Sequence, residues 1–594
     1  MKKILILPFV LLMTSRAFAL DDSTAVFLRH HIEYLASDAL EGRKAGSKGA
    51  EKAAAYIARQ FASIGLIPLG DSGSYLQSFG FTAGVTLGQK NALAAVEGTN
   101  KKSYLIDKDF RPLAFSASGD ATGSLAFAGY GISSTDTKYD DYAELDVKDK
   151  ILLVMRYSPA GDNPHSDYAK YLPLRSKTLT AREKGAKALI IVTGAADDST
   201  DDLMKLRYDN SFSNSGIPVF DVTRSVANQW LAGLHITIDS LQSTITSTKK
   251  PASFQIPGVI ISLTSDVVET KETSSNVVGL LRVTDTAKTE HLIIGAHYDH
   301  LGYGGEGSLA PDKVEIHNGA DDNASGTGAI IELARQMTAR RNSLKRNVLF
   351  ISFSGEEEGL LGSQYYVKHP VLSLTNAITM INLDMVGRLK EKTLTVQGTG
   401  TTSRWDSLLA QYNTDSTFLL KTVKDGFGPS DHSSFYGASI PVLFFWTGIH
   451  EDYHKPTDDA DKINYSGEAL LVEYVRKLAV DIDDHAQRPE YLKTQSITSP
   501  AGDSRGYRVY VGTVPDFSEQ TNGMKITAVR DNSPAAKGGL TGGDVIVKFG
   551  KFDVKNIYDY TYALQEYKPG DEVEVIVMRG NEKLTKKVKL EKRN

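Results

Sequence analysis

The sequence predicts an α/β fold for the middle of the chain, in which a sheet of short buried strands is sandwiched by helices. Residues 292–296, 347–353, 377–383 and 440–446 are apolar runs too short for helices, and polar residues bound them. A helical stretch follows the first run, at residues 327–340. Buried strands separated by helices are typical of an α/β sheet.

Side chains that can bind metal or transfer protons lie where these four strands end. The strands lead, in order, to His297-Tyr298-Asp299-His300, Glu356-Glu357-Glu358, Asp384 and Tyr453-His454. Taken singly, a triple Glu is typical of a charged surface loop and a lone Asp of a turn. Open α/β sheets, however, bind ligands at the carboxyl ends of their strands. Four strands that each deliver His, Asp or Glu at this end predict a functional site.

The residue types at these ends favour a metal site. Asp321, Asp322 and Asn323 stand just before the helical stretch, close in sequence to His297. Imidazole and carboxylate groups, in a chain without cysteine, suit zinc held by nitrogen and oxygen. By itself, the acidic run also fits a solvated loop whose negative charge favours a helix N-terminus.

Five motifs resemble those of a known family. They are HYDH (297–300), GADDNASG (319–326), EEEGLLGS (356–363), NLDMVG (382–387) and YHKPTDD (453–459), and they occur in this order. Together they resemble the dinuclear zinc aminopeptidase family that also contains glutamate carboxypeptidase, metallopeptidase family 28. The resemblance implies two Zn²⁺ ions per chain, a hydrolytic reaction and peptide substrates.

The resemblance also implies which residues hold the metals. The expected ligands are His297, Asp322, Glu357, Asp384 and His454. The bridging Asp of the family stands three residues before Ser-Gly, which matches Asp322 and not Asp321. A cis peptide bond commonly follows this Asp, so one is expected between Asp322 and Asn323.

Three further residues receive catalytic or supporting roles from the same motifs. Glu356 matches the general base, while Glu357 is the ligand and Glu358 is solvated. Asp299 is suited to orienting an imidazole or a carboxylate beside the metals. Tyr453 is expected to donate a hydrogen bond to the oxyanion. His300, His317 and His432 are expected to have structural or supporting roles rather than to bind metal.

Residues 1–19 are expected to be a signal peptide. A basic head is followed by an apolar core, residues 4–13, and by the small-x-small pattern Ala17-Phe18-Ala19. The apolar core is too short to span a bilayer, and no later run is long and uncharged enough to do so. The mature protein is therefore expected in the periplasm or medium of a bacterium, without an integral membrane segment.

The composition is that of a folded globular protein. The chain has 594 residues, of which 41% are hydrophobic, and a formal net charge of −5. This length suits about three or four domains. The negative charge gives no indication of nucleic acid binding. Because there is no cysteine, stability is expected from packing and from metal rather than from disulfides.

The domain layout follows from changes along the chain between helical patterns, short strands and a polar linker. We expect the N-terminal part of the peptidase at 20–109, an inserted, mostly-β domain at 110–254, the zinc peptidase at 255–493, a linker at 494–506 and a last domain at 507–594. The segment SDALEGRKAGSKGA, within the first part, is interpreted as a loop that connects two helices and has no catalytic role.

The inserted and final domains each resemble a known module. The pieces GYGI, AREKGAKALIIV and IPVFDV resemble a protease-associated (PA) domain, which is expected to cover or frame the cleft. The phrase ITAVRDNSPAAKGGLTGGDVIVKFG resembles a PDZ domain. PDZ domains add a peptide as an extra strand and hold its terminal carboxylate, so a peptide C-terminus is an expected partner.

The expected activity is that of an exported zinc aminopeptidase. A carboxypeptidase must hold a terminal carboxylate, usually with a cation such as Arg. Residues 425–454, which lead to the last His ligand, contain no Arg or Lys. We therefore expect removal of N-terminal residues, in particular apolar ones such as Leu. Phe427 and Phe435 are expected to line the pocket, whereas residues 444–446 are expected to form a buried strand.

Three alternatives remain open from the sequence. A carboxypeptidase of the same family shares every ligand and differs in its pocket. A glutaminyl cyclase relative shares the fold but uses one zinc ion. A non-catalytic binding protein is the third, although the complete ligand set and Glu356 argue against it.

Overall fold

The computed structural model describes residues 22–163, 166–208, 214–285, 287–305, 307–310, 313–494, 509–515, 522–530, 533–555, 557–565 and 567–592. The expected signal peptide and nearly all of the expected linker lie outside these residues. Within the described part of the chain, no helix combines the length and apolarity needed to cross a membrane.

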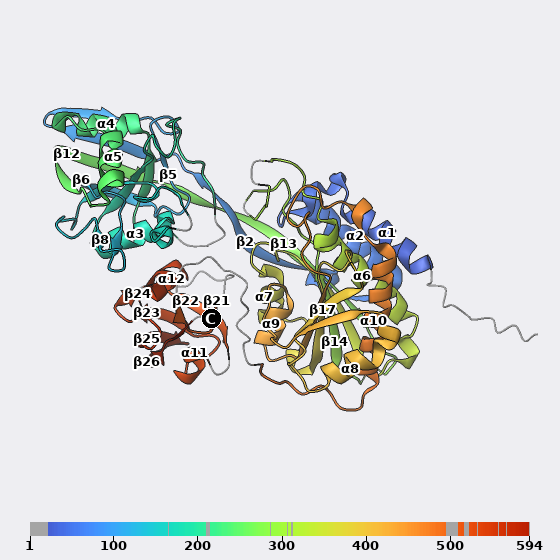
Figure 1. Cartoon of the computed structure of the whole chain (residues 1–594). Helices are drawn as coiled ribbons and strands as arrows, with labels where there is room; N and C mark the ends of the chain where they lie inside the picture. The colour runs from blue at the N-terminus through green and yellow to red at the C-terminus, as the bar shows by residue number, and fades with distance from the viewer. Residues whose placement is uncertain are drawn as a thin grey trace, which may run out of the picture.

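The largest sheet has nine strands and confirms the predicted α/β fold (Figure 1). Its path, in order, is β1 (Ile67–Pro68), β13 (Val267–Leu281), β15 (Asn347–Phe353), β14 (His291–His297), β16 (Ala377–Leu383), β19 (Val442–Trp446), β17 (Thr393–Gln397) and β18 (Leu419–Val423), and β2 (Leu76–Leu87) pairs with β13. The four central strands β15, β14, β16 and β19 are mutually parallel. Their carboxyl ends therefore meet at one edge.

Helices cover both faces of this sheet, as the sequence predicts. One face packs against α1 (Asp22–Leu35), α2 (Lys48–Ile64), α6 (Gly326–Thr338), α8 (Trp405–Tyr412) and α10 (Tyr465–Asp484). The other face packs against α7 (Leu361–Lys368) and α9 (His432–Gly437). Every residue of β14, β15 and β16 is buried, which explains why these strands are continuous apolar runs rather than alternating ones.

A second sheet forms the domain inserted between β2 and β13. Its order is β4 (Asn100–Ser103), β3 (Ala92–Glu97), β12 (Phe254–Ser265), β6 (Gly119–Phe127), β9 (Ile151–Met155), β10 (Ala188–Val192), β11 (Val219–Val222) and β5 (Phe110–Pro112), with helices α3 (Leu174–Glu183), α4 (Arg224–Leu231) and α5 (Ile238–Thr248). The short strands β7 (Ser133–Ser134) and β8 (Tyr139–Asp140) pair beside it.

This inserted sheet is wider than the span 110–254 expected from the sequence. Strands β3 and β4 precede residue 110, and β12 continues to Ser265. The sheet is wider because β12 is hydrogen-bonded to β3 on one side and to β6 on the other. The strands through which the chain enters and leaves the domain are therefore part of its sheet. The long antiparallel pair β2 and β13 then links this domain to the larger sheet (Figure 1).

The C-terminal unit is a small sheet with its own core. Its strands are β21 (Thr513–Pro515), β22 (Met524–Val529), β23 (Val545–Phe549), β24 (Phe552–Asp553), β25 (Glu572–Arg579) and β26 (Glu582–Lys589), its helices are α11 (Pro534–Lys537) and α12 (Ile557–Gln565), and β20 (Val509–Tyr510) pairs with β27 (Glu591–Lys592). This unit lies below the inserted domain and beside α7 and α9 (Figure 1). Ion pairs attach it to both: Arg182 to Asp559 at 3.1 Å and Arg530 to Asp425 at 2.6 Å.

A chain that ends at Gly506 is expected to stay soluble and to unfold cooperatively. The described residues of the C-terminal unit form their own hydrophobic core. None of them belongs to the hydrophobic cores of the two larger domains. Loss of the two ion pairs is expected to lower the melting temperature by only about a few degrees. Circular dichroism melting beside the full-length chain measures this. Aggregation of the shorter chain would show instead that the C-terminal unit is required for folding.

Candidate metal centre

The imidazole of His297, the last residue of β14, is oriented by a hydrogen bond to a nearby backbone group. Its Nδ1 lies 3.1 Å from the carbonyl oxygen of Asp299 and donates to it, which leaves the lone pair on Nε2. That Nε2 is 3.3 Å from Asp322 Oδ1 and 3.3 Å from Asp384 Oδ1. The three side chains, delivered by β14, by the loop before α6 and by the end of β16, therefore form one group of potential ligands.

His454 completes a second group on the other side of Asp322. Its Nε2 is 3.2 Å from Asp322 Oδ2 and 3.3 Å from Glu357 Oε2. Its Nδ1 lies 2.8 Å from the carbonyl oxygen of Gly307, so this imidazole is also held with Nε2 free to bind. Asp322 thus presents one carboxylate oxygen to each group, which is the arrangement of a bridging ligand.

The spacing of these atoms fits zinc. Ligand atoms about 2.0–2.2 Å from a tetrahedral zinc ion are about 3.3–3.6 Å apart, because the edge of a tetrahedron is about 1.6 times its centre-to-corner distance. The four nitrogen-to-oxygen distances in the two groups are 3.2–3.3 Å. In addition, Asp384 Oδ1 is buried and accepts no hydrogen bond from the described residues. Buried carboxylates without a compensating charge are costly, and cations at these two positions remove that cost.

The loop that carries Asp322 is shaped by contacts to its backbone. The peptide bond between Asp322 and Asn323 is cis, which confirms the prediction from the family motif. Asp458 Oδ2 accepts hydrogen bonds from the backbone N–H groups of Asp321 and Asp322, at 2.9 and 3.1 Å. Asn323 donates to the carbonyl oxygen of Leu383 at 3.0 Å, which ties the loop to the end of β16. Asp458 lies in the motif YHKPTDD, but the motif alone gives this residue no role.

Two further side chains fix the orientation of ligand carboxylates. Ser430 donates a hydrogen bond to Asp384 Oδ2 at 2.7 Å, on the oxygen that faces away from His297. His300 Nδ1 lies 2.6 Å from Glu357 Oε1, the oxygen that does not face His454. Each ligand carboxylate thereby keeps its other oxygen for the metal. His317 and His432 belong to neither group: the first contacts Ser308, and the second stacks on Phe444.

Glu356 lines the same space but belongs to neither ligand group. Its backbone N–H donates to Asp299 Oδ1 at 3.2 Å, so the Asp299 carboxylate supports the Glu356 loop, while the Asp299 carbonyl supports His297. Burial raises the pKa of Glu356 well above its ordinary value, and the neighbouring Asp384 and Glu357 carboxylates add to this increase.

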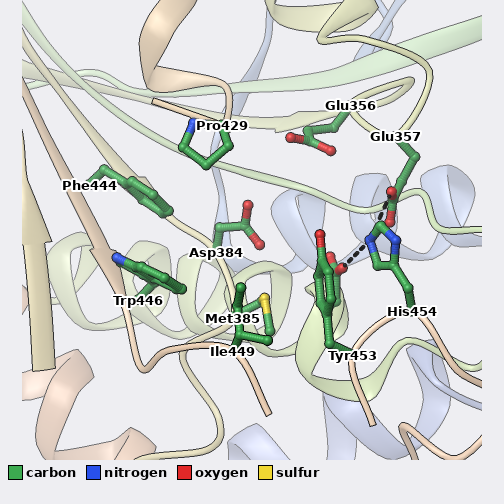
Figure 2. A pocket seen from close by; sticks show the side chains of 11 residues that line it. Glu356, Glu357, Asp384, Met385, Pro429, Phe444, Trp446, Ile449, Tyr453 and His454 are labelled. Carbon is green, nitrogen blue, oxygen red and sulfur yellow. Dashed lines mark ion pairs between the residues drawn. The ribbon is translucent and has the colours of Figure 1, made fainter. Parts of the chain in front are cut away.

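A pocket of about 120 Å³ opens onto these residues (Figure 2). One side is acidic, with Asp322, Glu356, Glu357 and Asp384, and the other is apolar, with Met385, Pro429, Phe444, Trp446 and Ile449. The described lining contains no Arg or Lys. The Tyr453 ring stacks on His454 with 3.8 Å between ring centroids, and its hydroxyl points toward the space between His454 and Asp384 (Figure 2).

The aromatic residues of this pocket differ from those expected. Phe444 and Trp446 line it, although residues 444–446 were expected to be only a buried strand. Side chains alternate along a strand, so residues 444 and 446 of β19 share one face while Phe445 enters the opposite core. Phe435 lies in α9 and is fully buried in the core, and Phe427 is not part of this pocket.

Arg43 connects three segments that surround the centre. Its side chain is fully buried, and it donates hydrogen bonds to the backbone carbonyl groups of Leu35, Tyr298, Asn318 and Gly319. Burial lowers its pKa to about 10, so the guanidinium remains charged at neutral pH. The connecting loop between the two helices therefore also binds, through Arg43, the two segments that carry His297 and Asp322. In the sequence, Arg43 is one basic residue between two helices, and nothing near it indicates that its side chain binds distant backbone groups.

Replacing Arg43 by Met is expected to destabilise the protein by at least about 3 kcal/mol, because four buried carbonyl groups lose their donor. Urea unfolding of the variant beside the wild type measures the change. The matched control is Arg29→Met, whose side chain is half exposed, pairs with Glu33 and lies over the Tyr465 ring. Equal stability of the two variants would contradict the structural role of Arg43.

Comparisons with known proteins find relatives for three parts of the chain. Family models match residues 276–479 as Peptidase family M28, residues 116–230 as a PA domain and residues 515–590 as a PDZ domain. The chain is 26% identical over 364 residues to aminopeptidase YwaD of Bacillus subtilis, covering 59% of this chain and 66% of that protein. It is 27% identical over 198 residues to a probable leucine aminopeptidase of Arthroderma otae, covering 31% and 52%. The chain thus spans less than two thirds of the length of these curated relatives.

The solved structures found for this chain include two aminopeptidases. An aminopeptidase from Aneurinibacillus sp. strain AM-1 is 25% identical, with a TM-score of 0.48, covering 82% of this chain and 99% of that one. The zinc aminopeptidase BSAP of Bacillus subtilis is 24% identical, with a TM-score of 0.46, covering 79% and 98%. The three family models confirm the three resemblances drawn from the motifs. The chain carries a peptidase domain of family M28 together with a PA domain and a PDZ domain.

Proposed function

We propose that the chain is an exported zinc-dependent aminopeptidase that removes N-terminal residues from peptides. The observation that carries this proposal is a pocket with acidic residues on one side, apolar residues on the other and no Arg or Lys in its described lining. The curated relatives named as aminopeptidases support the same reaction. Export rests on the pattern of residues 1–19.

Two groups of side chains are assigned to two zinc ions. His297, Asp322 and Asp384 are assigned to one ion, and Asp322, Glu357 and His454 to the other. A pair of zinc ions so held would supply electrophilic polarisation of the scissile carbonyl and a lowered pKa for a bound water. A one-zinc cyclase would not need both groups, and a non-catalytic relative would not need the buried Glu356 beside them.

Glu356 is assigned as the general base. Its carboxylate lines the pocket without joining either ligand group, so it is available to take a proton from the attacking water and to pass it to the leaving amine. Asp299 is assigned as a positioning residue, since its carboxylate accepts from the Glu356 backbone and its carbonyl from His297. Tyr453 is assigned as a donor to the oxyanion, because its hydroxyl points into the same space (Figure 2).

The charge of the pocket selects the end of the peptide. A free α-ammonium group is attracted by the Glu356 carboxylate, the acidic group of the described lining that is not assigned to zinc, whereas a terminal carboxylate would find no Arg or Lys there. The wall formed by Met385, Phe444 and Trp446 suits an apolar side chain. Its volume of about 120 Å³ is somewhat below the roughly 150 Å³ of a cavity that holds benzene, so one Leu-sized side chain is expected.

Substitution of the two adjacent glutamates should separate catalysis from metal binding. Glu356→Gln is expected to keep about two zinc equivalents per chain and to lower kcat by about 10²–10⁴, the usual contribution of a positioned acid–base group. Glu357→Gln is expected to lose zinc as well as activity. Elemental analysis and kinetics of both variants measure this, with Glu358→Gln as the matched control. Near-normal turnover of Glu356→Gln would show that the base lies elsewhere.

The proposed function is tested with three substrates. Leu-p-nitroanilide is expected to be hydrolysed, to lose activity on chelation and to regain it with zinc. N-acetyl-Leu-p-nitroanilide is expected to be cleaved at least about tenfold more slowly, because it lacks the charged amine. A peptide ending in Glu is expected to release its N-terminal residue first. Faster cleavage of the blocked substrate, or release of Glu first, would be evidence for the carboxypeptidase or another activity.

A further inference from the structure

Residues 425–430 form a loop that connects the PDZ domain with the metal centre. Its first residue, Asp425, is paired with Arg530 of the PDZ domain at 2.6 Å. Its last residue, Ser430, donates a hydrogen bond to Asp384 Oδ2 at 2.7 Å. One short loop therefore contacts an accessory domain at one end and an assigned zinc ligand at the other.

Arg530 is held in place by its own domain. It follows β22, and its backbone N–H donates to the carbonyl oxygen of Gly512 at 2.7 Å. Its guanidinium donates to Asp425 Oδ2 and lies 5.3 Å from the centroid of the Phe427 ring. A cation fixed by the PDZ domain thus makes two contacts with the start of the loop.

Asp425 uses both of its carboxylate oxygens. Oδ1 accepts from the backbone N–H of Phe427 at 3.0 Å and from Thr494 Oγ1 at 3.2 Å, and Oδ2 receives the guanidinium. Only 9% of this side chain is exposed, and a buried carboxylate without its cation is costly. Without Arg530, the Asp425 side chain is therefore expected to turn toward water and to give up its bonds to Phe427 and Thr494.

Beyond its first residue, the loop is closely packed against the peptidase. A Cβ atom at Gly426 would lie 2.5 Å from the Tyr436 ring, and one at Gly428 would lie 2.5 Å from Gln397 Nε2. Closely packed segments shift as units, because they have no space in which to deform gradually. A displacement at the start of this loop is therefore expected to reach Ser430.

The end of the loop contributes both to the catalytic pocket and to the metal centre. Pro429 lines the catalytic pocket (Figure 2). Ser430 Oγ accepts from Asn382 Nδ2 at 2.8 Å and donates to Asp384 Oδ2. The other oxygen of Asp384 is then directed at His297 Nε2, 3.3 Å away. Contacts that orient a ligand in this way typically contribute about 10–100-fold to metal affinity.

We propose that Arg530 of the PDZ domain is a positioning residue for the metal centre. Through Asp425 it fixes the loop that ends in Ser430, and Ser430 keeps Asp384 in the orientation that zinc requires. The PDZ domain thereby contributes to zinc affinity without touching metal or substrate. This inference rests on the assignment of Asp384 to zinc in the proposed function.

The test is a double-mutant cycle on zinc affinity in the full-length protein. Arg530→Met and Ser430→Ala are each expected to lower the affinity for one of the two zinc ions by about tenfold. The double variant is expected to bind zinc like Ser430→Ala alone, because both substitutions remove the same support. Arg530→Lys keeps the cation and is expected to recover most of the affinity. Competition with a chromophoric chelator measures both zinc dissociation constants.

Arg182→Met is the matched control. Arg182 pairs the same domain, through Asp559 at 3.1 Å, with the PA domain rather than with the peptidase. This variant is expected to leave both zinc dissociation constants unchanged. Wild-type zinc affinity of Arg530→Met, an equal loss in Arg182→Met, or a full additional loss in the double variant would each overturn the positioning role.

Kinetics with Leu-p-nitroanilide separate this inference from the proposed function. If the wild type hydrolyses this substrate while the zinc affinities contradict the positioning role, the aminopeptidase stands and the role of Arg530 is wrong. If the wild type binds two zinc ions without hydrolysing it, the aminopeptidase proposal fails, and the zinc affinities of the variants still decide the role of Arg530. A wild-type protein that binds no zinc overturns both.

Discussion

Buried negative charge at the carboxyl edge of the large sheet is the constraint on which the rest of the structure depends. Asp322, Glu357 and Asp384 are delivered there together with His297 and His454, and Asp322 faces both imidazoles. Such a cluster is stable only when cations or fixed hydrogen bonds compensate it. The spacing of the nitrogen and oxygen atoms fits zinc, and contacts from His300 and Ser430 fix Glu357 and Asp384 so that the second oxygen of each is available.

The supports of this cluster come from distant parts of the chain. Arg43 lies before α2, Asp458 follows the last ligand, and Ser430 precedes α9. Arg43 and Asp458 hold backbone groups, whereas Ser430 holds the Asp384 side chain directly. This division has a physical reason. A ligand loop keeps its geometry when its own N–H and C=O groups are satisfied, and its side chains then remain available for the metal.

The accessory domains stand in different relations to the centre. The PA domain is joined through the long strand pair β2 and β13, and it contacts the PDZ domain through Arg182 and Asp559. The PDZ domain contacts the loop at Asp425 that continues to Pro429 in the catalytic pocket. The PDZ domain is thus attached to a loop that lines the catalytic pocket, whereas the PA domain reaches the peptidase through a strand pair.

The apolar runs and the motifs at their ends were enough to predict the central strands and the site residues that follow them, and the family resemblance implied the cis bond at Asp322. The strands and their motifs could be predicted because an apolar run of strand length and the motif at its end are contiguous in the chain. The aromatic residues of the pocket and the distant groups that support the ligands became visible only with the folded chain. Phe444 and Trp446 face the pocket because of the face that β19 presents, and Arg43 and Asp458 act on backbone groups. Pairings between segments hundreds of residues apart depend on the packing of the whole sheet, and a single sequence carries no local signal for them.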